Sequence, residues 1–344
     1  MRGSSSGLFV LSLVVFAGCY DWDRFSRPRD GSIETDAGEP RDVGQNTDTG
    51  TSVTGTMGEV LGDFSCARPV LHIPVTEPRY ARIERFSIVN NELRPCRPLP
   101  VWGITGNSIV RAVAVAGDQV LAATESGACF LTVQDGRVQG QFRELLGPNV
   151  NILGAMPWTQ NGVSSFAVSL LDRMGTNTLS SVYRWNSVAW VEVILPTMFR
   201  ANFGPRALAT DPTDSSLVYA GIVQNQFLLS ARTDGSAVSV VASANEFPPF
   251  NFIHLGHPLN GQPNIVVTPQ SGSNVTSIMN STQIRPSVCA CPQMLYAVAH
   301  PDQQNPPFVI CSTATGTQVT RSGCAPLVTL PGVVRAPAIL LSAR

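Results

Sequence analysis

The sequence predicts an all-β chain that folds as a β-propeller, built from repeated sets of four short strands. Two segments carry this prediction: RAVAVAGDQVLAATESGACFLTVQDG from residue 111 and RALATDPTDSSLVYAGIVQNQFLLSARTDG from residue 206. Each contains short apolar runs separated by polar or glycine turns, in the same order and at similar spacing. The composition agrees, because 29 Gly and 26 Pro interrupt the 344 residues too often for long helices.

Further weak copies of this pattern begin near Phe64, Asn149, Phe252 and Met294. At about 45 residues per blade, the segment 64–344 predicts six blades. Seven blades and tandem β-sandwiches remain as alternatives, the sandwiches because the segments 143–163 and 243–263 look irregular. The terminal stretch APAILLSAR can pair with VLHIPV near the start of the domain, which would close the ring and remove its open edges.

The copy that starts at residue 206 resembles blades of the propeller superfamily that includes sortilin-like, Asp-box and photosystem-assembly proteins. Their pattern is R-x-L-A-x-D-P, then L-V-Y-A-G and a later S-x-D-G. The closing element departs from the pattern, because the spacing from Ser230 to Asp234 is longer and the aromatic residue after it is missing. The resemblance implies the fold and no particular activity. The matching residues are Arg206, Leu208, Ala209, Asp211, Pro212 and 217–221.

The N-terminus reads as a signal peptide over residues 1–18. Arg2 supplies the positive charge, and LFVLSLVVF is a predominantly apolar stretch of nine residues, far short of the roughly 20 that span a membrane. The following V-F-A-G-C resembles the bacterial lipobox, which implies that Cys19 is lipidated and becomes the new N-terminus. Tyr20 rather than Asp follows the cysteine, which favours the outer membrane. An ordinary secretory signal is the alternative.

Residues 19–63 are expected to form a disordered acidic linker, with ten acidic residues against four arginines from 20 to 63. The predicted order is therefore a signal peptide (1–18), a lipidated cysteine with its linker (19–63) and a propeller domain (64–344). The acids lack the spacing of a calcium loop.

Seven cysteines remain after Cys19, and in an exported protein they indicate disulfides rather than metal sites. We expect Cys66 to pair with Cys96, and Cys311 with Cys324. Cys289 and Cys291 face the same side of a strand, so one of them is expected to reach Cys129. The odd count leaves one thiol, expected to lie buried as a small hydrophobic group, with an intermolecular disulfide as the alternative.

The sequence selects no catalytic residues, metal ligands or cofactor. All 23 basic residues are arginine, which excludes lysine chemistry, and the net charge of −1 gives nucleic-acid binding no support. The histidines (His72, His254, His257 and His300) are expected on loops or the surface. We therefore predict a lipid-anchored lipoprotein that binds or scaffolds an envelope protein or polysaccharide. The alternative is a polysaccharide hydrolase or lyase, which would gather two carboxylates, or arginine with tyrosine, in one pocket.

Overall fold

The computed structural model describes residues 57–341 with gaps, and all of the described residues belong to the unit that spans 48–344. The gaps are 78–79, 103–108, 125–126, 135, 145–149, 173–179, 194–206, 212–213, 223–226, 235, 243–249, 260–261, 270–274, 281–282, 289–292, 302–304, 314–315, 322–325 and 332–338. The predicted signal peptide, Cys19 and most of the predicted linker lie outside the described residues. No helix in the described part of the chain is long and apolar enough to cross a membrane.

The described strands form six antiparallel sheets, numbered here in chain order. The first contains β25 (Ile339–Leu341), β2 (Val70–Glu77), β3 (Tyr80–Val89) and β4 (Glu92–Pro100). The second contains β1 (Met57–Leu61), β8 (Arg137–Glu144), β7 (Gly127–Gln134), β6 (Gln119–Thr124) and β5 (Val110–Ala116). The third contains β12 (Trp190–Val193), β11 (Ser180–Trp185), β10 (Val163–Asp172) and β9 (Val150–Gln160).

The remaining three sheets repeat the same four-strand plan. The fourth contains β13 (Ala207–Thr210), β14 (Leu217–Ile222), β15 (Phe227–Arg232) and β16 (Ser239–Ala242). The fifth contains β17 (Phe250–Leu259), β18 (Gln262–Pro269), β19 (Val275–Asn280) and β20 (Gln283–Val288). The sixth contains β21 (Gln293–Val298), β22 (Phe308–Thr313), β23 (Gly316–Thr320) and β24 (Pro326–Leu330).

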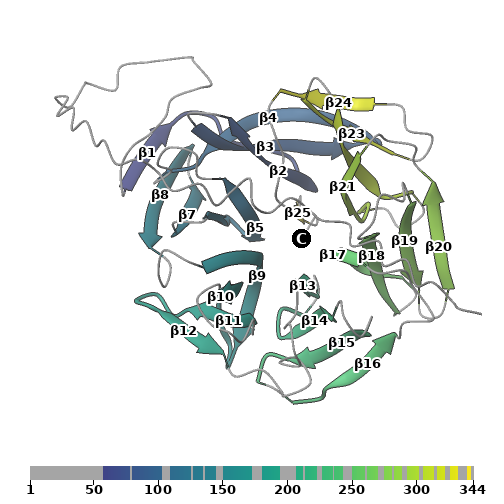
Figure 1. Cartoon of the computed structure of the whole chain (residues 1–344). Coiled ribbons are helices and arrows are strands. Elements are labelled where there is room, and N and C mark those ends of the chain that lie inside the picture. The colour runs from purple at the N-terminus through teal and green to yellow at the C-terminus, as the bar shows by residue number, and fades with distance from the viewer. Residues whose placement is uncertain are drawn as a thin grey trace, which may run out of the picture. The chain divides into compact units, whose positions relative to one another are not determined.

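The sheets stand in chain order around a ring, with β25, β5, β9, β13 and β17 nearest its centre (Figure 1). The predicted β-propeller is confirmed, and the alternative of tandem sandwiches is wrong. The weak repeats also mark the sheets correctly, since first strands begin at Val110, Val150, Ala207, Phe250 and Gln293. Alternating apolar runs and turn residues therefore located each repeat.

The C-terminal strand closes the ring, as the sequence predicted. Strand β25 pairs antiparallel with β2, with Val70 opposite Leu341 and His72 opposite Ile339. The last strand of the chain thereby becomes the innermost strand of the first sheet (Figure 1). This pairing satisfies an edge of β2 that would otherwise present unpaired backbone groups.

The predicted linker is wrong at its C-terminal end, because residues 57–61 form β1. This strand pairs with the outer edge of β8, from Met57 opposite Gln141 to Leu61 opposite Arg137. Its composition gave no sign of this, since main-chain pairing on a sheet edge does not require an apolar sequence. The remainder of the predicted linker lies outside the described residues, apart from Gly62 and Asp63.

The two segments that looked irregular contain long strands, β9 and β17. Each carries internal glycine and proline, which is why the sequence seemed to argue against strands. Both strands lie at an edge of their sheet. Proline is tolerated there because its missing N–H need not join the ladder.

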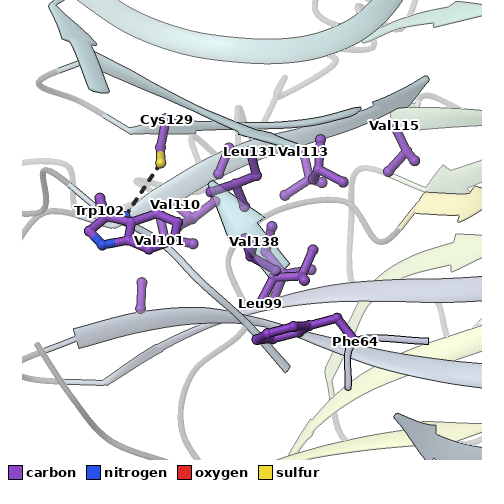
Figure 2. Close-up of a cluster of buried hydrophobic side chains, with 14 residues drawn as sticks. Phe64, Leu99, Val101, Trp102, Val110, Val113, Val115, Cys129, Leu131 and Val138 are labelled. Carbon is purple, nitrogen blue, oxygen red and sulfur yellow. Dashed lines mark hydrogen bonds between the residues drawn. The ribbon is translucent and has the colours of Figure 1, made fainter. Parts of the chain in front are cut away.

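A core cluster fills the joint between the first and second sheets (Figure 2). Trp102 is fully buried and packs against the paired glycines of β1 and β8. A Cβ atom at Gly58 would come within 2.0 Å of its Nε1, and one at Gly140 within 1.9 Å of its Cε3. Glycine at both positions is therefore what lets the indole ring approach these strands.

The described cysteines confirm one predicted pair and correct another. Cys66 and Cys96 form a disulfide. Cys129 is free and buried, so the expected bond from Cys289 or Cys291 to Cys129 is wrong. The Trp102 backbone N–H donates to the Cys129 Sγ at 3.4 Å, and burial raises the pKa of this thiol to about 12. Cys311 is disulfide-bonded to a residue outside the described ones. Cys289, Cys291 and Cys324 lie outside them, so the Cys311–Cys324 pair stays a prediction.

Candidate binding cleft

A cleft of about 300 Å³, lined by polar and apolar side chains in similar measure, lies at the joint between the first and second sheets. One wall is the segment 62–69, which joins β1 to β2 and which we call the strap. The opposite wall comes from the β5–β6 and β7–β8 turns, including Asp118 and Gly136, and the floor from β2 and β3, including His72 and Arg85. The cleft therefore exists only because β1 carries the chain across from the second sheet to the first.

The strap is held at several points along its length. The Gly62 N–H donates to the Gly136 carbonyl at 2.8 Å, and the Phe64 side chain is buried in the core cluster. The Ser87 hydroxyl donates to the Ala67 carbonyl at 2.6 Å, while the Cys66–Cys96 disulfide ties the strap to β4. These bonds fix the wall of the cleft, so a ligand would meet a preformed surface.

Arg85 is the buried cation of the cleft, with only 5% of its surface exposed. Its Nε and Nη2 both donate to the Arg97 carbonyl, at 3.0 and 2.8 Å, and Nη2 also donates to the Phe64 carbonyl at 2.9 Å. Nη1 has no hydrogen-bond partner among the residues that the structure describes. Burial lowers the pKa of Arg85 to about 10, and Asp63 opposes this shift, so the guanidinium stays charged at neutral pH.

The residues that line the cleft include two acids, Asp63 and Asp118, and a second arginine, Arg68. Arg68 forms an ion pair with Asp118 at 3.1 Å, in which the Asp118 side chain is 68% exposed. Hydrogen bonds from Ser65 hold the pKa of the Asp63 carboxyl below its usual range. The cleft therefore offers acceptors at its rim and a donor at its base.

These groups suit binding better than acid–base catalysis. A general acid needs a carboxyl with a raised pKa, whereas the pKa of Asp63 is lowered and Asp118 is held in an ion pair. Within the described residues, no three His, Cys, Asp or Glu side chains gather where they could hold a metal ion. Among the lining residues of the cleft, Arg85 contributes a buried guanidinium donor.

The residues that carry the family resemblance lie elsewhere, in the fourth sheet. Asp214 accepts from the Ser216 N–H at 3.0 Å and from Arg232 Nη1 at 2.9 Å, which fixes the β13–β14 turn. Burial, and secondarily the charge of Asp211, raise the pKa of Tyr219 to about 12. A phenol so hard to ionise is a poor nucleophile. The bonds to Asp214 hold the turn of this blade together.

A cluster of aromatic rings lies between the second and third sheets and serves packing. The ring centroids of Phe130, Trp185 and Trp190 lie 5.2 to 5.9 Å apart. Phe130 and Trp190 pack on the apolar core beneath them. Val188 at the tip of the β11–β12 hairpin is 83% exposed, but the rings themselves are only partly so.

The histidines were expected on loops or the surface; His300 lies outside the strands, whereas His72 and His254 lie within β2 and β17. His72 and His300 are buried, and His254 on β17 is partly buried, with its Nδ1 accepting from the Ala299 N–H at 3.1 Å. The side chain of His257 lies outside the described residues. The error arose because sequence cannot distinguish an inner strand from a loop when glycine and proline interrupt it.

His254 is expected to make the fold sensitive to acid. Burial lowers its pKa from 6.5 to about 4, so between these values the unfolded chain binds the proton more readily. Its contribution is complete above pH 6.5 and is lost as the pH falls toward 4, by up to about 3 kcal/mol. Urea unfolding at several pH values would measure this. His254→Asn keeps an acceptor but cannot titrate in this range, and should flatten the slope; an unchanged slope would contradict the account.

Sequence reasoning missed Arg85, and one signal in the sequence marks it. Ala81, Ile83 and Arg85 lie two residues apart on β3, where alternate residues face the same side. Ala81 and Ile83 are buried core residues, so an arginine continuing their row is exceptional. Asp118 lies at the β5–β6 turn, and its place in the cleft depends on the strap.

Solved structures resemble the chain at low sequence identity. A chain of the nidogen/laminin complex matches with a TM-score of 0.52 and 12% identity, over 80% of this chain and 99% of that one. The chain folds as a β-propeller. TolB from Acinetobacter baumannii matches at 0.48 with 10% identity, over 80% and 67% of the two chains. The SapL1 lectin in complex with alpha methyl fucoside matches at 0.41 with 15% identity, over 77% and 96%. The match to the nidogen/laminin chain supports the fold alone.

No protein family matches the sequence, and no curated protein does either. What this propeller binds must therefore be argued from its own surface.

Proposed function

We propose that this protein is an exported lipoprotein, anchored through Cys19 in the outer membrane, whose propeller binds an envelope or extracellular ligand in the cleft beside Arg85. One observation carries the binding part of the proposal. A buried guanidinium, whose Nη1 has no hydrogen-bond partner within the described part of the chain, lies in a preformed cleft whose carboxylates are ionised or paired. A hydrolase or lyase would instead need a carboxyl adapted to carry a proton.

We further infer that the ring has six blades. Support comes from the six sheets and from the core cluster that joins the sixth sheet to the first. In that cluster Val298 and Phe308 pack with Leu71 and Ile73. The sixth sheet thus adjoins the first without a further sheet between them.

Affinity capture with the full chain would test the binding proposal. The protein, extracted in detergent with a C-terminal epitope tag, is incubated with solubilised envelope, and retained protein and carbohydrate are both analysed. Gln134→Trp is the variant with a blocked cleft, because Gln134 is exposed at the cleft and a large ring there should prevent a ligand from entering. We expect a component retained by the wild type and lost with Gln134→Trp. Equal retention by both proteins would place binding elsewhere.

Cys19→Ser should abolish the lipid anchor. A serine cannot form the thioether to the diacylglycerol, so metabolic labelling with a radioactive fatty acid should fall to background, and the protein should leave the membrane fraction. A second acyl-independent anchor would be indicated if the variant stayed with the membrane. Unchanged labelling would contradict the assignment of Cys19.

A further inference from the structure

We propose that the cleft binds one acidic sugar unit of a polysaccharide, with the carboxylate of the sugar on Nη1 of Arg85 and its hydroxyls at the rim acids. This inference rests on the proposed function, because it names the ligand class for the same cleft. It draws on three features of the cleft: the buried arginine, the charge balance of the rim and the volume.

The buried arginine selects an anionic group. Backbone carbonyls saturate Nε and Nη2 of Arg85, and they hold the plane of the guanidinium fixed. The N–H groups of Nη1 are then the donors left for a ligand. A guanidinium that is already oriented and desolvated recognises a carboxylate with little further ordering.

The rim limits the ligand to about one negative charge. Arg68 and Arg85 are balanced by Asp63 and Asp118 among the lining residues. A run of carboxylates, as in an acidic peptide, would place its second charge against one of these acids. Sugar hydroxyls can instead donate to both carboxylates, so a unit with one carboxylate and several hydroxyls satisfies the base and the rim together.

The volume suits a single unit. About 300 Å³ is at the small end of the range for small-molecule pockets. Gly117 and Gly136 adopt positive φ values of 60° and 71° at the two turns, and neither carries a side chain that would narrow the wall. The remaining units of a polysaccharide would continue outside the cleft.

The test uses the full chain in detergent micelles and two oligosaccharides that differ in one group. The first is a hexasaccharide that contains glucuronate, and the second is its carboxyl-reduced form. Calorimetric titration should show at least tenfold weaker binding of the reduced form. Equal affinities would overturn the proposal. Tighter binding of a hexaglutamate peptide than of the acidic hexasaccharide would also overturn it, and would indicate a protein ligand.

Variants locate the site and separate folding from binding. Arg85→Lys keeps a positive charge but loses the planar guanidinium and its several N–H donors. It should weaken binding of the acidic hexasaccharide at least tenfold. If that variant fails to fold, Gln134→Trp still decides, because it changes an exposed residue and should also abolish binding. Asp118→Asn removes a rim charge and should strengthen binding of the acidic probe about threefold. Arg137→Gln, outside the lining, is the matched charge control and should change nothing.

The two proposals fail in different ways. A chain that captures envelope carbohydrate in a Gln134-dependent manner, yet binds both hexasaccharides equally, retains the proposed function and loses the acidic-sugar inference. A chain that captures nothing through the cleft loses both.

Discussion

Deleting residues 337–344 is expected to unfold the propeller at temperatures where the intact protein is stable. The deletion removes β25, which pairs with β2 from Val70 to His72 at the inner edge of the first sheet. Strand β2 would then present an open edge, and its buried Leu71 and Ile73 would lose a neighbouring strand. The free energy of unfolding of a protein is typically only about 5–15 kcal/mol. Removing β25 should therefore lower it by a large fraction.

The urea midpoint and the rate of proteolysis would measure the effect. A deletion of only 342–344, beyond β25, is the matched control and should change neither quantity. An intact midpoint after removal of 337–344 would mean that the ring does not depend on its terminal strand.

Trp102→Ala is expected to lower the free energy of unfolding by about 3–5 kcal/mol, the usual loss for a large buried aromatic side chain. Trp102 is fully buried and covers Gly58 on β1 and Gly140 on β8. Without the indole ring, the pair of glycines would face a cavity, because neither can fill it. Strand β1 should therefore loosen, and the strap that it anchors should loosen with it.

Denaturant unfolding measures the free energy of unfolding, and hydrogen exchange at residues 57–61 measures how far β1 loosens. Trp102→Phe keeps part of the ring volume and should show a smaller loss of both stability and protection. A loss below about 1 kcal/mol for Trp102→Ala would contradict the packing described here.

The repeats of the fold could be predicted from the sequence because they depend on local signals. Turn residues such as Gly117, with its positive φ, separate apolar runs at a regular interval, and each run became a strand. The pairing of β25 with β2 was also predictable, since an apolar strand at each end of the chain has no other partner in a closed ring.

The cleft could not be predicted, because it depends on contacts distant in the sequence. Strand β1 has a composition that resembles a linker, and it becomes a strand only because the edge of β8 is available. The strap then lies between Gly136 and β3, and this brings Asp118 toward Arg68, 50 residues earlier in the chain. The one sequence signal for Arg85 was its position two residues after Ile83 in a strand whose alternate residues are apolar, and this signal was missed.

Photo-crosslinking in intact cells tests most directly whether the cleft takes an envelope ligand. An amino acid with a short aliphatic diazirine, no bulkier than glutamine, replaces Gln134 at the cleft in one variant, and the exposed Val240 on β16 of the fourth sheet in another. The account predicts a discrete crosslinked product that contains carbohydrate from position 134 and none from position 240. Absence of any product at position 134, or the same product at both positions, would contradict it.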